Sequence, residues 1–356
     1  MWVCSKCNSQ NYDNNNYCGR CGTPKIGSPN NTNNKKKHIP LLLSCILVAA
    51  VIIAWIILEG RMTPEEKRMD NQYQTALTKL ENNGLEDCLD GLWILLELGD
   101  YKDSEALSEK LINEYGGLAA IGDKYRDGQD VAQNYDKAKE WYLKAAEFGN
   151  SSAMRRIAGM YYSGKGVSID YNKAMEWYLK AAELGDATAM CLIGNMYRYG
   201  ENIDKDGFHD YNKAMEWYLK AAELGNTSAM NGIANLYYNG FGVPKDYNKE
   251  MEWHLKAAEL GDATAMYFIG NMYYNGEGVS KDYGKAMEWY LKAAALGDES
   301  PVGAGNAMNL IGNMYRFGEG VSKDYGKAME WLLKAIDLGN EAAKSNMESL
   351  LDQMSR

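Results

Sequence analysis

The sequence has little proline, histidine or phenylalanine. Six Pro and three His occur among its 356 residues, and five Phe stand against 26 Tyr. Scarce proline argues against a turn-rich all-β architecture and favours helices. The three histidines, His38, His209 and His254, have no patterned partner, and the chain contains no GxSxG, HExxH, P-loop or GxGxxG motif. We therefore expect a protein that is not an enzyme and that has no small-molecule substrate.

Only the N-terminal segment of the chain has an excess of positive charge. The formal net charge is −10, yet residues 1–38 hold six Lys/Arg and one Asp, so the remainder holds 32 basic and 47 acidic residues. Because Lys and Arg contacts to phosphates supply most of the affinity for nucleic acids, an acidic body argues against a nucleic-acid partner. The cysteines are also unsuited to a disulfide framework, since Cys45, Cys88 and Cys191 stand alone.

The other four cysteines have the spacing of a zinc site. Cys4 and Cys7 form one CxxC pair, and Cys18 and Cys21 form a second after ten residues. Four thiolates saturate a tetrahedral Zn²⁺ and leave no position for an activated water, so we expect a structural zinc ribbon over residues 1–24. Redox CxxC pairs or disulfides are the alternatives. The segment resembles the short zinc-ribbon module at the N-termini of many bacterial membrane proteins, which implies a metal rather than a function.

A charge-free run at residues 39–58 follows a polar, basic linker at residues 25–38. Twenty helical residues span about 30 Å, the thickness of a bilayer's hydrocarbon core. A buried core helix is the alternative, and a cleavable signal peptide fits poorly because the run is long and 38 residues precede it. We predict a single transmembrane helix, which makes the membrane one partner of the chain.

Basic residues around this run predict its orientation. The nineteen residues before it carry five Lys/Arg, including the triplet Lys35, Lys36 and Lys37, whereas the twenty after it carry three among four acidic residues. Lys and Arg accumulate on the cytoplasmic side of membrane helices. We therefore expect a cytoplasmic N-terminus and an extracytoplasmic body.

A tryptophan-centred phrase recurs six times in that body. It reads DYNKAMEWYLKAAELG at both 170–185 and 210–225, and phrases such as AMYFIGNMYYNGEGV at 265–279 alternate with it. The tryptophans are spaced 36, 40, 36, 36 and 42 residues apart and are Trp141, Trp177, Trp217, Trp253, Trp289 and Trp331. Periods of this length indicate stacked supersecondary units.

Each period contains the signals of two helices. Asp170 and its equivalents are placed to cap a second helix, and Gly185 and its equivalents to end it. Gly276 and Gly278 are placed to end a first helix and turn the chain. Trp177 shares one helical face with small alanines, so we expect it to fill the space between helices.

These phrases resemble Sel-one-like repeats, a branch of the tetratricopeptide-like α/α superfamily. All six units over residues 116–339 match most of the family pattern A…LG…Y..G.G…D..KA..W..KAA..G. The departures are Ala158 and Ala234 for the mid-helix Gly, Glu250 for Ala, and residues 202–203 for Gly-Val. The resemblance implies an all-α fold, a right-handed α/α solenoid of six helix pairs.

One cysteine-rich secreted branch of this family has been linked to penicillin binding, which would make the chain a cell-envelope hydrolase. That property depends on a cysteine pair in each repeat, and these repeats lack one. The resemblance therefore implies a non-enzymatic protein.

Helices are expected on both sides of the repeats. Residues 59–115 carry three helical segments that form a spacer capping the array, and residues 340–356 form a C-terminal capping helix. The two longer tryptophan spacings are explained by loop insertions at 198–210 and 297–306.

A stripe on the first helices is the candidate partner-binding surface. Solenoids bind along equivalent positions of successive repeats, and Tyr and Arg anchor many interfaces. The alternative is that Asn bridges neighbouring repeats and Tyr only packs. The candidate residues are Tyr162, Asn195, Arg198, Asn235, Tyr238, Asn271, Tyr274, Asn313 and Arg316.

We therefore expect a membrane-anchored scaffold or adaptor that binds protein partners along its solenoid. The alternative is a signalling receptor that couples binding outside to the zinc ribbon inside.

We predict one zinc ion per chain, because four thiolates saturate the ion. Metal analysis of the reduced, purified protein measures this stoichiometry. Cys18→Ser should lose the zinc, whereas Cys45→Ser, outside the two CxxC pairs, should keep it. A stoichiometry near zero in the unmutated chain would refute the site.

Overall fold

The structure of the protein is a computed structural model that describes residues 2–3, 10–11, 62–82, 84–200 and 209–355. The chain divides into two compact units, Met1–Gly116 and Gly117–Arg356, and each is described by itself. The predicted zinc ligands Cys4, Cys7, Cys18 and Cys21 and the predicted membrane helix at 39–58 lie outside the described residues.

The described residues of the first unit form a short strand pair and three helices. Strands β1 (Trp2–Val3) and β2 (Gln10–Asn11) pair antiparallel, with Trp2 opposite Asn11. The helices are α2 (Pro64–Glu81), α3 (Leu85–Leu98) and α4 (Ser104–Glu114), and each packs on the next. Among the described residues of the whole chain, no helix is both long enough and apolar enough to cross a bilayer.

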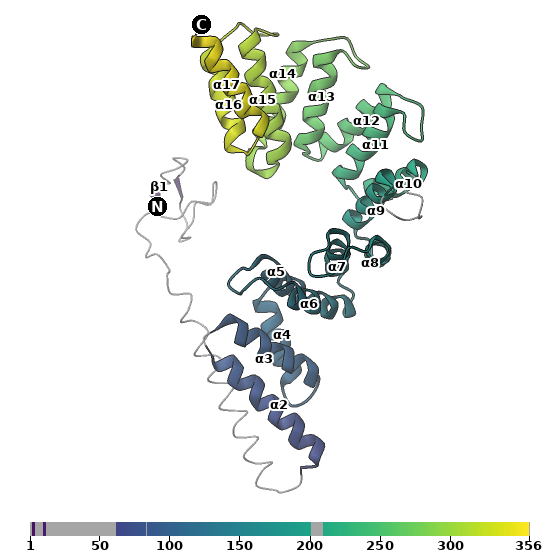
Figure 1. Cartoon of the computed structure of the whole chain (residues 1–356), viewed down its shortest axis with the longest axis vertical. Coiled ribbons are helices and arrows are strands. Elements are labelled where there is room, and N and C mark those ends of the chain that lie inside the picture. The colour runs from purple at the N-terminus through teal and green to yellow at the C-terminus, as the bar shows by residue number, and fades with distance from the viewer. Residues whose placement is uncertain (1, 4–9, 12–61, 83, 201–208, 356) are drawn as a thin grey trace. The chain divides into compact units, whose positions relative to one another are not determined.

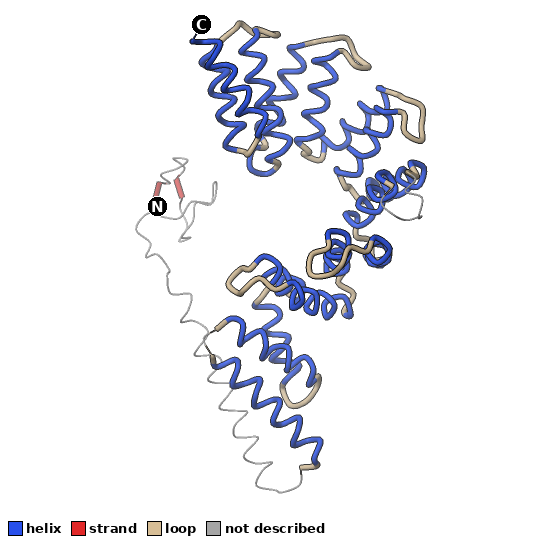
Figure 2. Tube along the Cα trace, viewed as in Figure 1, coloured by secondary structure: helices blue, strands red, loops and turns tan. Residues whose placement is uncertain are grey.

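The second unit is an array of helix pairs, as the sequence predicted (Figure 1). Each first helix packs on the second helix of its own repeat, and each second helix packs on the first helix of the next repeat. Figure 2 shows the loops of this unit in tan between its helices, with residues 201–208 left undescribed. The helices are α5 (Leu118–Asp127), α6 (Tyr135–Glu147), α7 (Ser151–Ser163), α8 (Tyr171–Glu183), α9 (Ala187–Tyr199), α10 (Tyr211–Glu223), α11 (Thr227–Asn239), α12 (Tyr247–Glu259), α13 (Ala263–Asn275), α14 (Tyr283–Ala295), α15 (Pro301–Phe317), α16 (Tyr325–Asp337) and α17 (Glu341–Ser355), with a 3-10 turn η1 (Gly297–Glu299) before α15.

Side-chain caps and glycines set the helix ends. The Asp170 carboxylate accepts a hydrogen bond from the Lys173 N–H at 3.0 Å and starts α8, as predicted. First helices are capped in the same way, for example α9 by Asp186. Gly276 ends α13 with a φ of 78°, in the left-handed region where a side chain is strained.

A buried tyrosine of the second helix packs against a glycine of the first helix. The rings of Tyr218 and Tyr290 are fully buried. A Cβ atom added at Gly194 would lie 2.6 Å from the Tyr218 ring, and one added at Gly270 would lie 2.3 Å from the Tyr290 ring. Non-bonded carbon atoms stay at about 3.5 Å or more, so the ring requires the glycine.

The hydroxyl of each such tyrosine is satisfied by the residue after the glycine. Tyr218 donates to Asn195 Oδ1 at 2.6 Å and Tyr290 donates to Asn271 Oδ1 at 2.7 Å. The sixth repeat has Leu332 at the tyrosine position, and the buried Oδ1 of Asn313 then has no partner among the described residues. The phenol therefore fills a gap and pairs a buried polar group at once.

The expectation that tryptophan fills the space between helices is met only in part in five of the six repeats, where the tryptophan packs against the core from its edge. Trp177 and its equivalents in later repeats are only partly buried, and the lysine three residues later lies over each indole ring. The Lys180 nitrogen is 4.2 Å from the Trp177 ring centroid. The residue after the tryptophan, for example Tyr178, is the buried one because it lies at the centre of the helix face that packs on the first helix.

The insertion before the sixth repeat is partly helical rather than a loop. Residues 297–299 form η1, and α15 then begins at Pro301, where the missing N–H of proline costs nothing. At 17 residues α15 is longer than the other first helices. The other insertion, 198–210, is described only at its ends, because residues 201–208 lie outside the described set.

Candidate partner-binding site

The nine candidate residues lie on five first helices of the second unit. They belong to α7, α9, α11, α13 and α15, and all nine are partly buried. They are Tyr162, Asn195, Arg198, Asn235, Tyr238, Asn271, Tyr274, Asn313 and Arg316. Partly buried side chains are anchored by the fold and still offer surface to a partner.

Several of the nine bridge one repeat to the next. The Arg198 guanidinium donates to Asn235 Oδ1 at 2.6 Å, which ties α9 to α11. Arg316 donates to Gln353 Oε1 at 2.9 Å and so ties α15 to α17. The Tyr274 hydroxyl donates to Glu319. These contacts support the bridging interpretation for part of the stripe.

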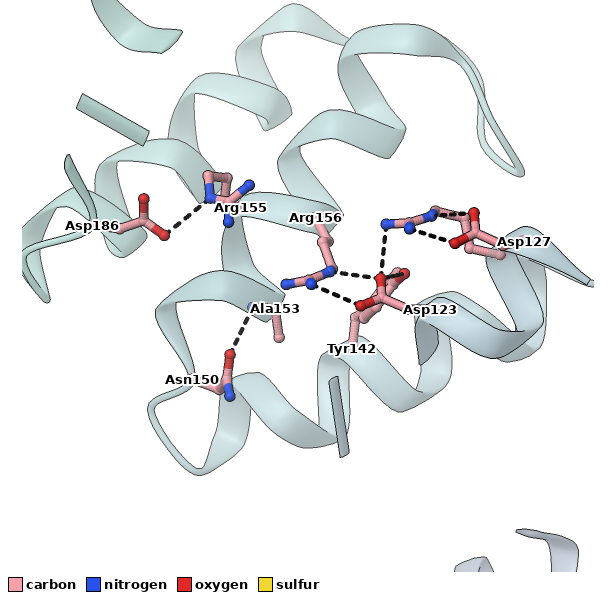
Figure 3. A network of polar contacts seen from close by, with 9 residues as sticks. Asp123, Asp127, Tyr142, Asn150, Ala153, Arg155, Arg156 and Asp186 are labelled. Carbon is pink, nitrogen blue, oxygen red and sulfur yellow. Dashed lines mark hydrogen bonds and ion pairs between the residues drawn. The ribbon is translucent and has the colours of Figure 1, made fainter. Parts of the chain in front are cut away.

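Similar bridges precede the stripe in the first repeats (Figure 3). Arg156 on α7 makes two bonds of 2.7 Å to the Asp123 carboxylate on α5, and Tyr142 donates to the same carboxylate at 2.8 Å. Arg155 donates to Asp186, the cap of α9, at 3.0 Å. The polar ladder along the first helices therefore fixes how successive repeats stack.

The tyrosines of the stripe pack edge-on against a second tyrosine in the same repeat. Tyr238 meets Tyr247, the first residue of α12, with ring centroids 6.1 Å apart. Lys245 lies over both rings, at 4.9 Å and 4.6 Å from their centroids. Aromatic pairs with a nearby cation form rigid, amphipathic surface, which is the kind that anchors protein interfaces.

A cavity of about 200 Å³ opens beside this surface, between the fourth and fifth repeats. It is lined from α11, α12 and α13, and two of its residues are side chains that depart from the repeat pattern, Glu250 and His254. Glu250 is 5% exposed and His254 is 3% exposed. The candidate residues Asn235, Tyr238 and Asn271 also line it.

Hydrogen bonds assign the orientation of the His254 ring. The Asn231 side-chain nitrogen donates to the Asp262 carboxylate at 3.1 Å, so Asn231 Oδ1 faces the imidazole and accepts from Nδ1 at 2.9 Å. In the neutral ring Nε2 is then an acceptor, and it lies 3.9 Å from Glu250 Oε1. Phe268 stacks on the imidazole with centroids 5.0 Å apart.

Burial disfavours the charged forms of both residues. The pKa of Glu250 is raised to about 7. Desolvation is the main cause, the nearby charge of Glu277 adds to the increase, and Lys245 opposes it. Desolvation lowers the pKa of His254 to about 4, against the charge of Asp262. At neutral pH the imidazole is therefore uncharged and the carboxyl is poised between its two forms.

The sequence contained the signal for this cavity. Glu250 replaces an alanine that is fully buried in the other five repeats, and His254 replaces the buried tyrosine four residues later on the same helix. Both departures are visible when the repeats are compared. The cavity beside them depends on how α11, α12 and α13 pack together. Within the described ranges no group of three or more His, Cys, Asp or Glu side chains is placed to hold a metal ion.

Replacement of Glu250 should change how stability depends on pH. A carboxyl whose folded pKa is raised from 4.5 to about 7 favours folding below pH 4.5 and loses that contribution as the pH rises through 7. Glu250→Gln should therefore be more stable than the unmutated protein at pH 8, by up to roughly 3 kcal/mol. The advantage should vanish by pH 4.5.

Urea unfolding at pH 4.5, 6 and 8 measures this difference, and Glu252→Gln, an exposed position on the same helix, serves as the control. Because the pKa of His254 is lowered to about 4 in the folded protein, its titration reduces the stability of both proteins as the pH falls from about 6.5 toward 4. This contribution is the same in both proteins and cancels when their stabilities are compared. A pH-independent difference between Glu250→Gln and the unmutated chain would contradict the buried carboxyl.

Comparison with known proteins agrees with this architecture. The Sel1 repeat model matches residues 117–150, 151–186, 187–226, 227–262, 263–298 and 305–340. The crystal structure of a Sel1 repeat protein from Oxalobacter formigenes is similar at 33% identity and a TM-score of 0.56, over 70% of this chain and 99% of that one.

A second similar structure is that of c5321, a protective antigen of uropathogenic Escherichia coli strains with an SLR fold. It is 28% identical with a TM-score of 0.55, and the match covers 80% of this chain but 56% of the antigen. A comparison with curated proteins gives no significant match. Sel1 repeats generally mediate protein–protein interactions and are typically non-catalytic. Because the six matched repeats make up more than half of the chain, the protein belongs to the Sel1 repeat family.

Proposed function

We propose that this protein is a membrane-anchored scaffold that binds a protein partner along the first helices of its repeats. The observation that carries the proposal is the succession of partly buried Tyr, Arg and Asn side chains at equivalent positions of α7, α9, α11, α13 and α15. Inter-repeat bridges hold these side chains in place, so little conformational entropy is lost when a partner binds. Tyr and Arg are also the residues that supply most binding energy at protein interfaces.

The N-terminal segment adds a zinc ribbon and an anchor to this proposal. Two CxxC pairs supply four thiolates, a donor set that suits a closed Zn²⁺ site. The antiparallel pairing of β1 with β2 supports the ribbon, because these strands flank the first CxxC pair in the sequence. The metal would supply folding free energy to a segment too short to bury a core.

The anchor is the charge-free run at 39–58, and the basic triplet Lys35, Lys36 and Lys37 supports a cytoplasmic N-terminus with the repeats on the other side. A partner of the repeats would then be extracytoplasmic or belong to the outer face of the membrane. Such an anchor would hold the partner near that face.

Photo-crosslinking in cells tests the proposed surface. A benzophenone amino acid at position 238, in the candidate stripe, should give a specific protein adduct. The same residue at Leu260, which is 57% exposed at the end of α12, should give none. Once the adduct is identified, Tyr238→Ala should weaken binding at least about fivefold, equivalent to about 1 kcal/mol.

The thermal midpoint of Tyr238→Ala should stay close to that of the unmutated chain, because this side chain is only partly buried. Adducts at Leu260 but not at 238 would place the partner elsewhere.

A further inference from the structure

The fourth repeat departs from its neighbours at three positions that belong to one packing arrangement. Ala234 stands where the third and fifth repeats have the glycine that seats a tyrosine ring, and His254 stands where they have that tyrosine. Glu250 stands one turn before His254, where the other repeats have a fully buried alanine. Glu250 and His254 both line the 200 Å³ cavity.

The cavity is lined with hydrogen-bond acceptors that lack donors. Glu250 Oε2 is buried and has no hydrogen-bond partner among the described residues. The neutral His254 ring presents Nε2 as an acceptor, because Nδ1 donates to Asn231. Glu277 contributes a second carboxylate to the lining. An unpaired buried carboxyl of this kind destabilises the empty protein, and a ligand that donates hydrogen bonds to it would offset that cost.

No cation of this part of the chain satisfies these groups. Lys245 is the nearest candidate, but its nitrogen lies over the rings of Tyr238 and Tyr247. Among the described residues it forms no ion pair with Glu250 or Glu277. The lining of the cavity therefore carries two carboxyl groups and no Lys or Arg.

The walls favour a flat cation over a spherical one. Two aromatic residues, Tyr238 and Phe268, line the cavity, and the two acceptors Glu250 Oε1 and His254 Nε2 are 3.9 Å apart. A guanidinium group offers five N–H donors in one plane and stacks on aromatic rings, whereas an ammonium group is a compact and strongly hydrated charge.

We propose that this cavity binds the guanidinium group of an arginine side chain from the protein partner. The proposal rests on the proposed function, since Asn235, Tyr238 and Asn271 belong both to the partner-binding stripe and to the cavity. Glu250 accepts from the guanidinium and becomes fully ionised when it binds. The other charged or titratable groups around it are Glu277, Lys245 and His254, with Asp262 behind Asn231.

Binding should therefore depend on pH. Below the pKa of Glu250, which burial raises to about 7, the guanidinium must displace a proton, so affinity should increase from pH 5.5 to pH 8. In Glu250→Gln this dependence should disappear. His254 keeps its uncharged form over most of that range, since burial holds its pKa near 4.

N-acetyl-arginine amide tests the site on the full-length protein in detergent. The chain has three histidines, so histidine-selective isotope labelling gives an NMR spectrum in which His254 is assigned by its loss in His254→Gln. The arginine amide should shift the His254 signals saturably. The neutral isostere N-acetyl-citrulline amide should not shift them, and N-acetyl-lysine amide should bind at least about fivefold more weakly.

Variants distinguish recognition from folding. Glu250→Gln should weaken the arginine amide at least tenfold, and Glu250→Ala, which restores the residue of the other repeats, should do the same while keeping the fold. The exposed Glu252→Gln should bind as the unmutated protein does. Equal binding of citrulline or lysine amide, or full affinity in both Glu250 variants, would overturn the proposal.

These amides need no partner, so the site and the scaffold function can fail separately. Arginine binding without a crosslinked partner at 238 would contradict the scaffold role alone. A crosslinked partner whose affinity is unchanged in Glu250→Gln would contradict the arginine anchor alone.

Discussion

The contact between a second-helix tyrosine and a first-helix glycine determines how the first, third and fifth repeats close. The ring lies so close to the first helix that a single methyl group at Gly194 or Gly270 would collide with it. Its hydroxyl then donates a hydrogen bond to the side-chain oxygen of the next residue, Asn195 or Asn271. One side chain thus fills the gap between two helices, supplies their shared hydrogen bond and fixes the position of an Asn on the outer stripe. Removing such a ring from a core costs roughly 3–5 kcal/mol.

Two of the repeats that lack this contact are packed differently at the same place. In the second repeat Ala158 replaces the glycine, but Gly159 follows, and a Cβ there would lie 3.9 Å from the Tyr178 hydroxyl. The fourth repeat has Ala234 and His254 at these two positions, and Glu250 is buried one turn before the histidine. A solenoid tolerates one such repeat because each unit contacts only its neighbours, so the loss stays local. The proposed binding surface depends on the repetition of the array, whereas the cavity depends on the altered fourth repeat.

The periodic part of the fold could be predicted from the sequence because the signals that begin and end the helices recur in each of the six repeats. Asp170 and Gly185 have their expected capping roles, and the helix pairing follows from them. The sequence did not show that Tyr178 is more deeply buried than Trp177. The two residues are adjacent and a helical face is about 100° wide, so periodicity alone does not tell which ring is central. The Glu250–His254 cavity could not be predicted, since its existence depends on the distance between α11, α12 and α13. The partner-binding role of residues such as Tyr238 stays a prediction, as does the zinc site.

The most direct test of the glycine–tyrosine contact is the effect of Ala234→Gly on the free energy of unfolding in two backgrounds. In the unmutated protein, where His254 leaves the position loosely filled, glycine inside α11 should destabilise by roughly 0.5–1 kcal/mol through backbone entropy. In the Glu250→Ala/His254→Tyr background the same change should stabilise the protein, because the new ring needs the space that the Ala234 methyl group occupies. Equal destabilisation in both backgrounds would contradict the account.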